Sequence, residues 1–323
     1  MSFSGTSSRP QGLPPLAVRR PEEARRRRAA EADRVKPGFL DEHDFTSRFH
    51  TLQMRGLTLL LRLMGLYEQG FNNALDMRLV EREFFWPDLP PGLNGLRLLH
   101  LSDLHLPRSM PDFAERARRL LEGVEADLCL MTGDYRYGYY GPSDHVARAV
   151  QEVLSSVRAR QGCYAVLGNH DTLEVGETLE GAGIRVLLNE GVLLDLNGAP
   201  VWLAGVDDPH FYHDDDMGRA LAGRPEGVFT LMLGHSPESV SKAAGSGVDL
   251  FLCGHTHGGQ IRLPWLGGVH TNVRKGKKQG IGAWRVGGMR GHTSTGLGVT
   301  DVPVRFLCPP EATLITLRRG GGA

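Results

Sequence analysis

Five apolar runs of this chain each end in a short polar cluster, and this series restricts the fold more than any other feature. The clusters are LSDLH (residues 101–105), TGD (132–134), LGNHD (167–171), LGH (233–235) and CGHTH (253–257). Apolar runs of this length, bounded by glycine, are typical of buried strands. Because ligand sites of open α/β sheets lie at the carboxyl ends of strands, the five clusters are predicted to converge on one crevice.

The order of helical and strand-like segments indicates an α/β fold. Amphipathic stretches near residues 111–124 and 143–160 alternate with apolar runs, which predicts strand–helix units around a buried sheet. A run that alternates like an edge strand comes first (LVEREFF), and five further runs come later: VLLDL, VWLAGV, VFTLMLG, VDLFLCG and ATLITL. Since strands outnumber helices in the second half, we expect a second sheet packed on the first.

The polar clusters supply ligands of the kind that bind divalent metals. Residues one apart on an extended segment point to the same side, so Asp103 and His105 can share one cavity, as can His255 and His257. A neighbouring glycine such as Gly254 lets the backbone approach a ligand closely. The candidate metal ligands are carboxylates, imidazoles and one amide oxygen: Asp103, His105, Asp134, Asn169, His235, His255 and His257. This set suits two ions of Mn, Fe, Zn or Co that share a bridging carboxylate.

The ordered blocks D-x-H, GD, GNHD, GH and GHTH resemble those of the calcineurin-like metallophosphoesterases over roughly residues 78–319. GHTHGGQIRLPWLG and GLGVTDVPVRFLCPPEATLITL further resemble the bacterial membrane-associated phosphodiesterases, some of which hydrolyse the pyrophosphate of UDP-2,3-diacylglucosamine. The resemblance implies a four-layer α/β/β/α sandwich of two packed mixed sheets, with a dinuclear metal site at the carboxyl ends of the strands. It implies that Asp103, His105, Asp134 and His257 hold one ion, and that Asp134, Asn169, His235 and His255 hold the other.

The resemblance also implies a reaction, in which hydroxide activated by the two ions attacks a phosphodiester or pyrophosphate bond. His170 would act on the leaving oxygen as a general acid or as a stabilising cation. Many family members carry an aspartate three residues after the bridging one, where this chain has Tyr137, which leaves open the group that orients His170. A soluble phosphomonoesterase and a non-catalytic metal-binding scaffold on the same fold are the alternatives.

Two segments precede the expected catalytic domain, residues 78–319. Residues 1–38 are rich in Ser, Pro, Gly and Arg, and we predict a disordered Pro/Arg-rich tail. Residues 39–77 are predicted to form an amphipathic helical segment, whose apolar stretch from Leu57 to Leu66 is too short to span a bilayer. Two interpretations stay open: a helix lying in a membrane surface, and a helix docked on the catalytic domain or on a second copy.

Composition favours a cytoplasmic protein. Its 37 basic and 37 acidic residues balance, so the overall charge does not select nucleic acid. The four cysteines form no CxxC pair, and the first three lie in apolar, strand-like runs where a thiol behaves as a small hydrophobe, which indicates a reducing compartment. No secretion signal is evident. We expect a phosphorylated small-molecule or lipid substrate, no specific nucleic acid, and peripheral attachment to the cytoplasmic face of the inner membrane if residues 51–67 bind lipid.

Three other polar segments need separate interpretations. The acidic run DDPHFYHDDD (residues 207–216) precedes a helical stretch, so we interpret its carboxylates as caps rather than metal ligands. His43 is interpreted as part of a solvated helix start. No acidic residue lies between Asp249 and Asp301, and we expect the basic residues there to form a patch on the substrate side that attracts phosphate or anionic lipid headgroups: Arg262, Arg274, Lys275, Lys277, Lys278, Arg285 and Arg290.

Overall fold

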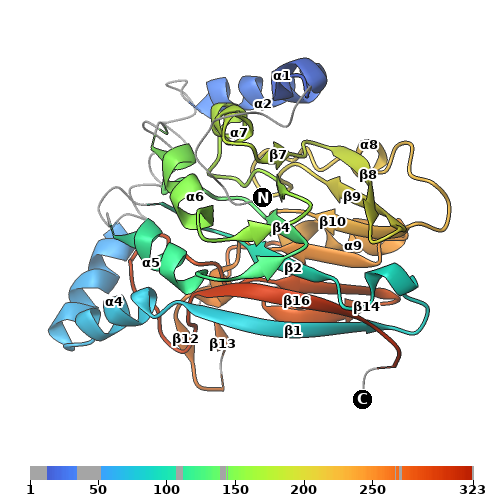
Figure 1. Cartoon of the computed structure of the whole chain (residues 1–323). Coiled ribbons are helices and arrows are strands. Elements are labelled where there is room, and N and C mark those ends of the chain that lie inside the picture. The colour runs from blue at the N-terminus through green and yellow to red at the C-terminus, as the bar shows by residue number, and fades with distance from the viewer. Residues whose placement is uncertain are drawn as a thin grey trace.

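Two six-stranded sheets pack face to face, with helices on both outer sides (Figure 1). The computed structural model describes residues 13–34, 52–106, 112–138, 143, 145–265, 267–268 and 271–321.

The first sheet contains, in order, β1 (Arg78–Trp86), β16 (Glu311–Arg319), β2 (Arg97–Leu101), β4 (Leu128–Met131), β6 (Cys163–Ala165) and β7 (Arg185–Val186). The second contains β14 (Gly282–Val286), β15 (Met289–Thr293), β11 (Leu250–Cys253), β10 (Phe229–Leu233), β9 (Ala199–Gly205) and β8 (Glu190–Leu196). Most neighbours are parallel, and the antiparallel pairs are β16–β2, β14–β15 and β8–β9. Two small sheets pair β3 (Glu125–Ala126) with β5 (Arg158–Ala159), and β12 (Arg262–Leu263) with β13 (Gly267–Gly268).

Alternate residues of the central strands divide between separate cores. On β2, Leu99 faces the outer helices, whereas Leu98 faces the second sheet. The first sheet is covered by α5 (Phe113–Leu120), α6 (Val146–Leu154) and α7 (Leu173–Gly181), and the second by α8 (Met217–Ala220) and α9 (Val240–Gly245). The predicted four-layer α/β/β/α sandwich is therefore confirmed.

The hairpin of β14 and β15 was not predicted from the sequence. The strand β15 reads MRGHT and is poor in apolar residues, yet it pairs in parallel with β11 inside the second sheet. A Cβ atom at Gly291 would lie 2.1 Å from the ring of Trp284 on the facing strand. The glycine thus makes room for an indole ring, which supplies apolar surface that β15 lacks.

The prediction of a disordered tail is wrong for residues 13–34, whereas residues 1–12 and 35–38 lie outside the described part of the chain. Two helices occupy this stretch, α1 (Leu16–Arg19) and α2 (Pro21–Arg34), and α2 lies over α7 (Figure 1). Leu16 and Ala24 are buried in the first core. The arginines, which made the segment look unable to fold, pair with carboxylates of the catalytic domain, including Glu190 and Asp214.

The described part of the predicted amphipathic segment contains two helices, residues 52–63 and α4 (Tyr67–Leu75). Leu61 packs against Val302 and Val304, so the first helix is docked on the catalytic domain. Its other side exposes a set of large apolar side chains: Leu52, Leu59, Leu60, Leu63 and Met64. Among the described residues, no helix has the length and apolarity needed to cross a membrane. His43 lies outside the described residues.

Candidate metal centre

The seven predicted ligands lie together where the carboxyl ends of strands from both sheets meet. Asp103 and His105 follow β2, Asp134 follows β4 and Asn169 follows β6. His235 follows β10, and the pair His255 and His257 follows β11. All seven side chains are buried. The convergence expected from the strand ends is therefore present.

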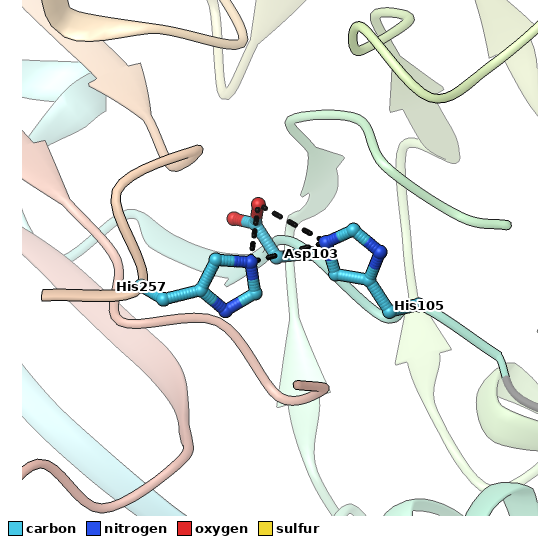
Figure 2. A group of neighbouring side chains, drawn as sticks. All are labelled: Asp103, His105 and His257. Atoms are coloured by element: carbon cyan, nitrogen blue, oxygen red, sulfur yellow. Dashed lines mark hydrogen bonds and ion pairs between the residues drawn. The ribbon is translucent and has the colours of Figure 1, made fainter. Parts of the chain in front are cut away.

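One group of donor atoms combines the first and last sequence blocks. His105 Nε2 lies 3.0 Å from His257 Nε2, and Asp103 Oδ1 lies 3.5 Å from His257 Nε2 and 3.9 Å from His105 Nε2. The three side chains point toward one another from two loops, Asp103 and His105 from the loop after β2 and His257 from the loop after β11 (Figure 2). Their atoms are close enough for one ion to bind all three.

A second group is centred on His235. Its Nε2 atom lies 2.9 Å from Asn169 Oδ1, 3.1 Å from His255 Nδ1 and 3.2 Å from Asp134 Oδ2. The same Asp134 oxygen is 3.5 Å from His105 Nε2 in the first group. Asp134 thus stands between the two groups, as a bridging ligand must.

The outer nitrogen of three imidazoles is held by a backbone carbonyl. His235 Nδ1 donates to Thr132 O at 2.7 Å, His105 Nδ1 to Arg136 O at 3.2 Å, and His255 Nε2 to Asn272 O at 3.0 Å. Each of these bonds places the ring proton on the outer nitrogen. In a neutral ring the inner nitrogen then presents a lone pair to the cluster, which is the arrangement of metal-bound histidine.

The backbone at these residues is strained. Five of the seven have positive φ: Asp103 (49°), His105 (38°), Asp134 (56°), His255 (70°) and His257 (49°). Left-handed conformations at non-glycine residues cost on the order of 1–3 kcal/mol each and persist only where the surroundings hold them. The strained backbone at this edge of the sheets therefore lowers the stability of the fold, and it directs these side chains inward.

Burial and mutual repulsion set the protonation of the cluster. Burial lowers the pKa of His105 to about 3 and holds the pKa of His257 well below its usual value, so both rings are neutral. Burial also raises the pKa of Asp134 to about 7, although His235 opposes this shift. Burial lowers the pKa of His235, but nearby carboxylates outweigh it and raise it to about 10. His235 therefore carries a proton on the nitrogen that faces the cluster, and binding of a divalent ion there would release this proton.

The donor set fits a pair of divalent ions. It combines two carboxylates, four imidazoles and one amide oxygen, and no cysteine belongs to the three ligand groups found among the described residues. Hard and borderline donors of this kind suit Mn, Fe, Zn or Co and not an all-cysteine zinc site.

His170, the predicted catalytic residue, lies at the edge of this cluster. Its Nε2 atom is 3.9 Å from Asp134 Oδ2, and its ring centroid is 4.7 Å from that of His105. Its backbone N–H donates to Asp134 Oδ1 at 2.9 Å. Tyr137, at the position of the usual aspartate, is part-exposed and donates to the backbone oxygen of Asp301.

Asp171 has a role that the sequence did not reveal. Its carboxylate accepts the N–H groups of Asp134 (2.8 Å), Tyr135 (2.9 Å) and Gly168 (2.9 Å). It therefore ties the loop after β4 to the loop after β6. An aspartate next to His170 was visible in the sequence, but a carboxylate that accepts backbone N–H groups leaves no distinct sequence pattern.

Two carboxylates of residues 207–216, those of Asp208 and Asp216, have the structural role that was predicted. Asp208 accepts the N–H groups of Phe211 and Tyr212, and Asp216 caps α8 by accepting the N–H of Arg219. His210 in the same run differs, because its ring centroid lies 4.4 Å from that of His255. Sequence reasoning missed this histidine by treating the run as a unit.

The predicted basic patch is only partly at the centre. Asn272 contacts His255 through its backbone oxygen. Arg274 and Lys275 come two and three residues later in the chain, and both side chains are exposed. Arg285 of β14 and Arg290 of β15 are instead opposite each other in the β14–β15 ladder. They lie near the start of β15, at the end of the strand away from the ligands. Their predicted place beside the substrate is wrong, because the unexpected hairpin carries them away.

Comparison with known proteins connects this geometry to a family. Residues 96–259 match the model of the family described as calcineurin-like phosphoesterase. The metallophosphoesterase YkuE of Bacillus subtilis (strain 168) is 31% identical over 71% of this chain and 82% of its own length. The phosphodiesterase YaeI of Escherichia coli (strain K12) is 31% identical over 68% of this chain and 82% of its own length. A transmembrane protein with metallophosphoesterase domain from Bos taurus is 33% identical over 54% of this chain and 43% of its own length.

Proposed function

Because this chain belongs to the calcineurin-like phosphoesterase family and is a metal-dependent phosphoesterase, we propose that it hydrolyses a phosphodiester or pyrophosphate bond of a lipid- or nucleotide-linked substrate. The observation that carries the proposal is Asp134, which lies between two groups of buried donor atoms. A carboxylate in that place can share its oxygens between two ions.

The proposed ligands are those expected from the sequence. Asp103, His105, Asp134 and His257 hold one ion, and Asp134, Asn169, His235 and His255 hold the other. When bound, two divalent ions acidify a water molecule and neutralise the charge of the phosphate. The chain fixes the tautomers of three of the four imidazoles through backbone carbonyls and excludes solvent by burying all seven ligands.

His170 acts beside the ligands in this proposal. Its ring lies at the rim of the cluster, where it can reach the leaving oxygen of a substrate held by the ions. Donating a proton there, or stabilising the developing negative charge, contributes roughly 10²- to 10⁴-fold to such reactions.

Two features favour an anionic substrate larger than inorganic phosphate. Arg274, Lys275, Lys277 and Lys278 are exposed next to the segment that contacts His255. The relative YaeI is named a phosphodiesterase, which supports a diester as the first substrate class to test.

Exposed apolar side chains near the centre support a lipid-linked substrate and peripheral membrane attachment. The helix of residues 52–63 packs with Ile261 and Phe306, and Arg262 N donates to Phe306 O. Trp265 in the following hairpin is fully exposed, and Leu307 is 67% exposed. An apolar surface with basic neighbours is the pattern of an interfacial membrane contact.

Hydrolysis of bis(p-nitrophenyl) phosphate by purified protein, with metal analysis, tests the activity. Asp134→Ala should lose the metal pair and all measurable activity, whereas Asp88→Ala, which alters an exposed turn, should keep both. A wild-type protein that contains no metal, and whose activity is unchanged by chelators, would overturn the proposal.

Sedimentation with anionic phospholipid vesicles at low salt tests the lipid contact. Leu60→Ser together with Leu63→Ser should release the protein without changing hydrolysis of the soluble diester. Leu193→Ser is the matched control, because this leucine is 49% exposed on β8, outside the helix. Wild-type protein that stays entirely in the supernatant would show that the helix serves only to dock on the domain.

A further inference from the structure

Arg27 of α2 reaches from the N-terminal segment into the loop that carries Asn169 and His170. Its side chain is fully buried and forms an ion pair with the buried Asp207. Its Nη2 atom donates to Gly168 O at 2.8 Å and to Asp171 O at 2.8 Å. These two carbonyls flank Asn169 and His170, so one guanidinium holds both ends of the loop.

Neighbouring groups hold the guanidinium in place. Arg27 Cζ lies 3.8 Å from the ring centroid of Tyr212, whose hydroxyl donates to Asp171 O at 2.9 Å. Asn189 accepts the backbone N–H of Asp207 at 2.9 Å. Since the Asp171 carboxylate in turn accepts the backbone N–H of Asp134, the contacts of Arg27 extend to the backbone of the proposed bridging residue.

We propose that Arg27 is a positioning residue, which holds the loop Gly168–Asp171 in the geometry that Asn169 and His170 need. Residues 13–34 are then part of the active-site support, although they lie outside the residues that match the family model. The catalytic part of this inference rests on the proposed two-ion hydrolysis.

The chemistry of the contact requires arginine. Arg27 serves a carboxylate and two carbonyls at once, which needs several donors in a planar fork. A lysine at this position keeps the charge but offers a single ammonium group, which cannot reach all three acceptors from one place. Arg27→Lys therefore separates the geometry of the contact from its charge.

The test compares Arg27→Lys and Arg27→Met with Arg19→Met in the full-length protein. Arg19 is the matched control, because it joins the same segment to Glu180, Glu190 and Val186 O and touches no residue of the loop. Partners that orient metal ligands typically contribute roughly 10- to 100-fold in metal affinity or activity. We expect a loss of that size in the affinity for the second metal ion, and in kcat with little change in KM, for both Arg27 variants.

Hydrogen exchange of peptides that cover residues 168–173 provides a readout independent of catalysis. Exchange should accelerate in the Arg27 variants and stay at the wild-type rate in Arg19→Met, even where both substitutions lower the Tm equally. If Arg27→Met does not fold, Arg27→Lys decides.

Arg27 variants with wild-type metal affinity, kcat and exchange would overturn the inference. So would equal changes in the Arg19 and Arg27 variants, because the segment would then contribute stability alone. If the wild-type protein hydrolyses no phosphoester, the proposed function fails, and exchange with metal affinity still decides the role of Arg27.

Discussion

Adding one methyl group at residue 254 should dismantle half of the proposed two-ion centre. A Cβ atom built on Gly254 would lie 1.9 Å from Ser102 Oγ and 2.1 Å from Asp103 Oδ2. Ordinary contacts to carbon begin near about 3.5 Å, so the alanine in Gly254→Ala must displace these atoms by more than ~1 Å.

Neither oxygen can move aside easily. Ser102 Oγ donates to Asp103 Oδ2 at 2.6 Å and accepts from Thr132 Oγ1 at 2.7 Å. Asp103 also accepts the N–H of His255 at 3.0 Å. Metal–ligand distances tolerate about 0.2 Å, and a misplacement of about 1 Å can cost on the order of 100-fold in rate. We therefore expect Gly254→Ala to lose the ion bound by Asp103 and at least ~100-fold in diester hydrolysis.

Metal content, hydrolysis of bis(p-nitrophenyl) phosphate and Tm together form the assay. Gly245→Ala is the matched control, since a Cβ there meets nothing within 4 Å and the residue ends the helix before β11. This variant should keep both ions and full activity. Gly254→Ala with two ions and wild-type activity would refute the argument that the glycine is there for close approach.

Three further predictions concern catalysis, metal and pH. His170→Ala should keep both ions but lose roughly 10²- to 10⁴-fold on substrates with poor leaving groups, and less on aryl esters; equal losses on both classes would leave it a role in substrate positioning only. Chelation should lower the Tm, since each ion at a hundred times its Kd contributes about 2.7 kcal/mol, and a Tm indifferent to added Mn²⁺ would contradict the assigned ligands. Burial lowers the pKa of His292 to about 3, so the unfolded chain binds a proton there that the folded chain excludes. Stability is then lost as pH falls below 6.5, by about 2 kcal/mol between pH 7 and 5, and chemical denaturation of His292→Gln should show a flatter pH profile than wild type.

The centre was predictable because its signal is local. Strand ends such as LFLCGHTH place ligands and their glycines within a few residues. Because the carboxyl ends of neighbouring strands meet at one edge of the sheet, these ligands come together in space. Asp103, Asp134 and His257 accordingly lie where the sequence places them. The four-layer architecture followed from the same apolar runs together with the family resemblance.

What the sequence could not show depends on partners distant along the chain. Arg27 is one of four consecutive arginines, which is typical of solvated segments, and only Asp207 and the carbonyls around Asn169 make it a core residue. In the same way β15 needs Trp284 from the facing strand before it can pack. The composition of a short stretch of sequence cannot reveal either contact.

The place of β16 in the first sheet has a consequence for the order of folding. This strand follows every other described strand in sequence, yet it lies between β1 and β2 and forms a ladder with each. A chain emerging from the ribosome therefore holds β1 and β2 with unpaired edges until residues 311–319 are made. Such long-range closure is slow and leaves strands open to aggregation or to chaperones. A nascent chain halted before Glu311 should remain protease-sensitive in the residues of β1, and release of the complete chain should protect them.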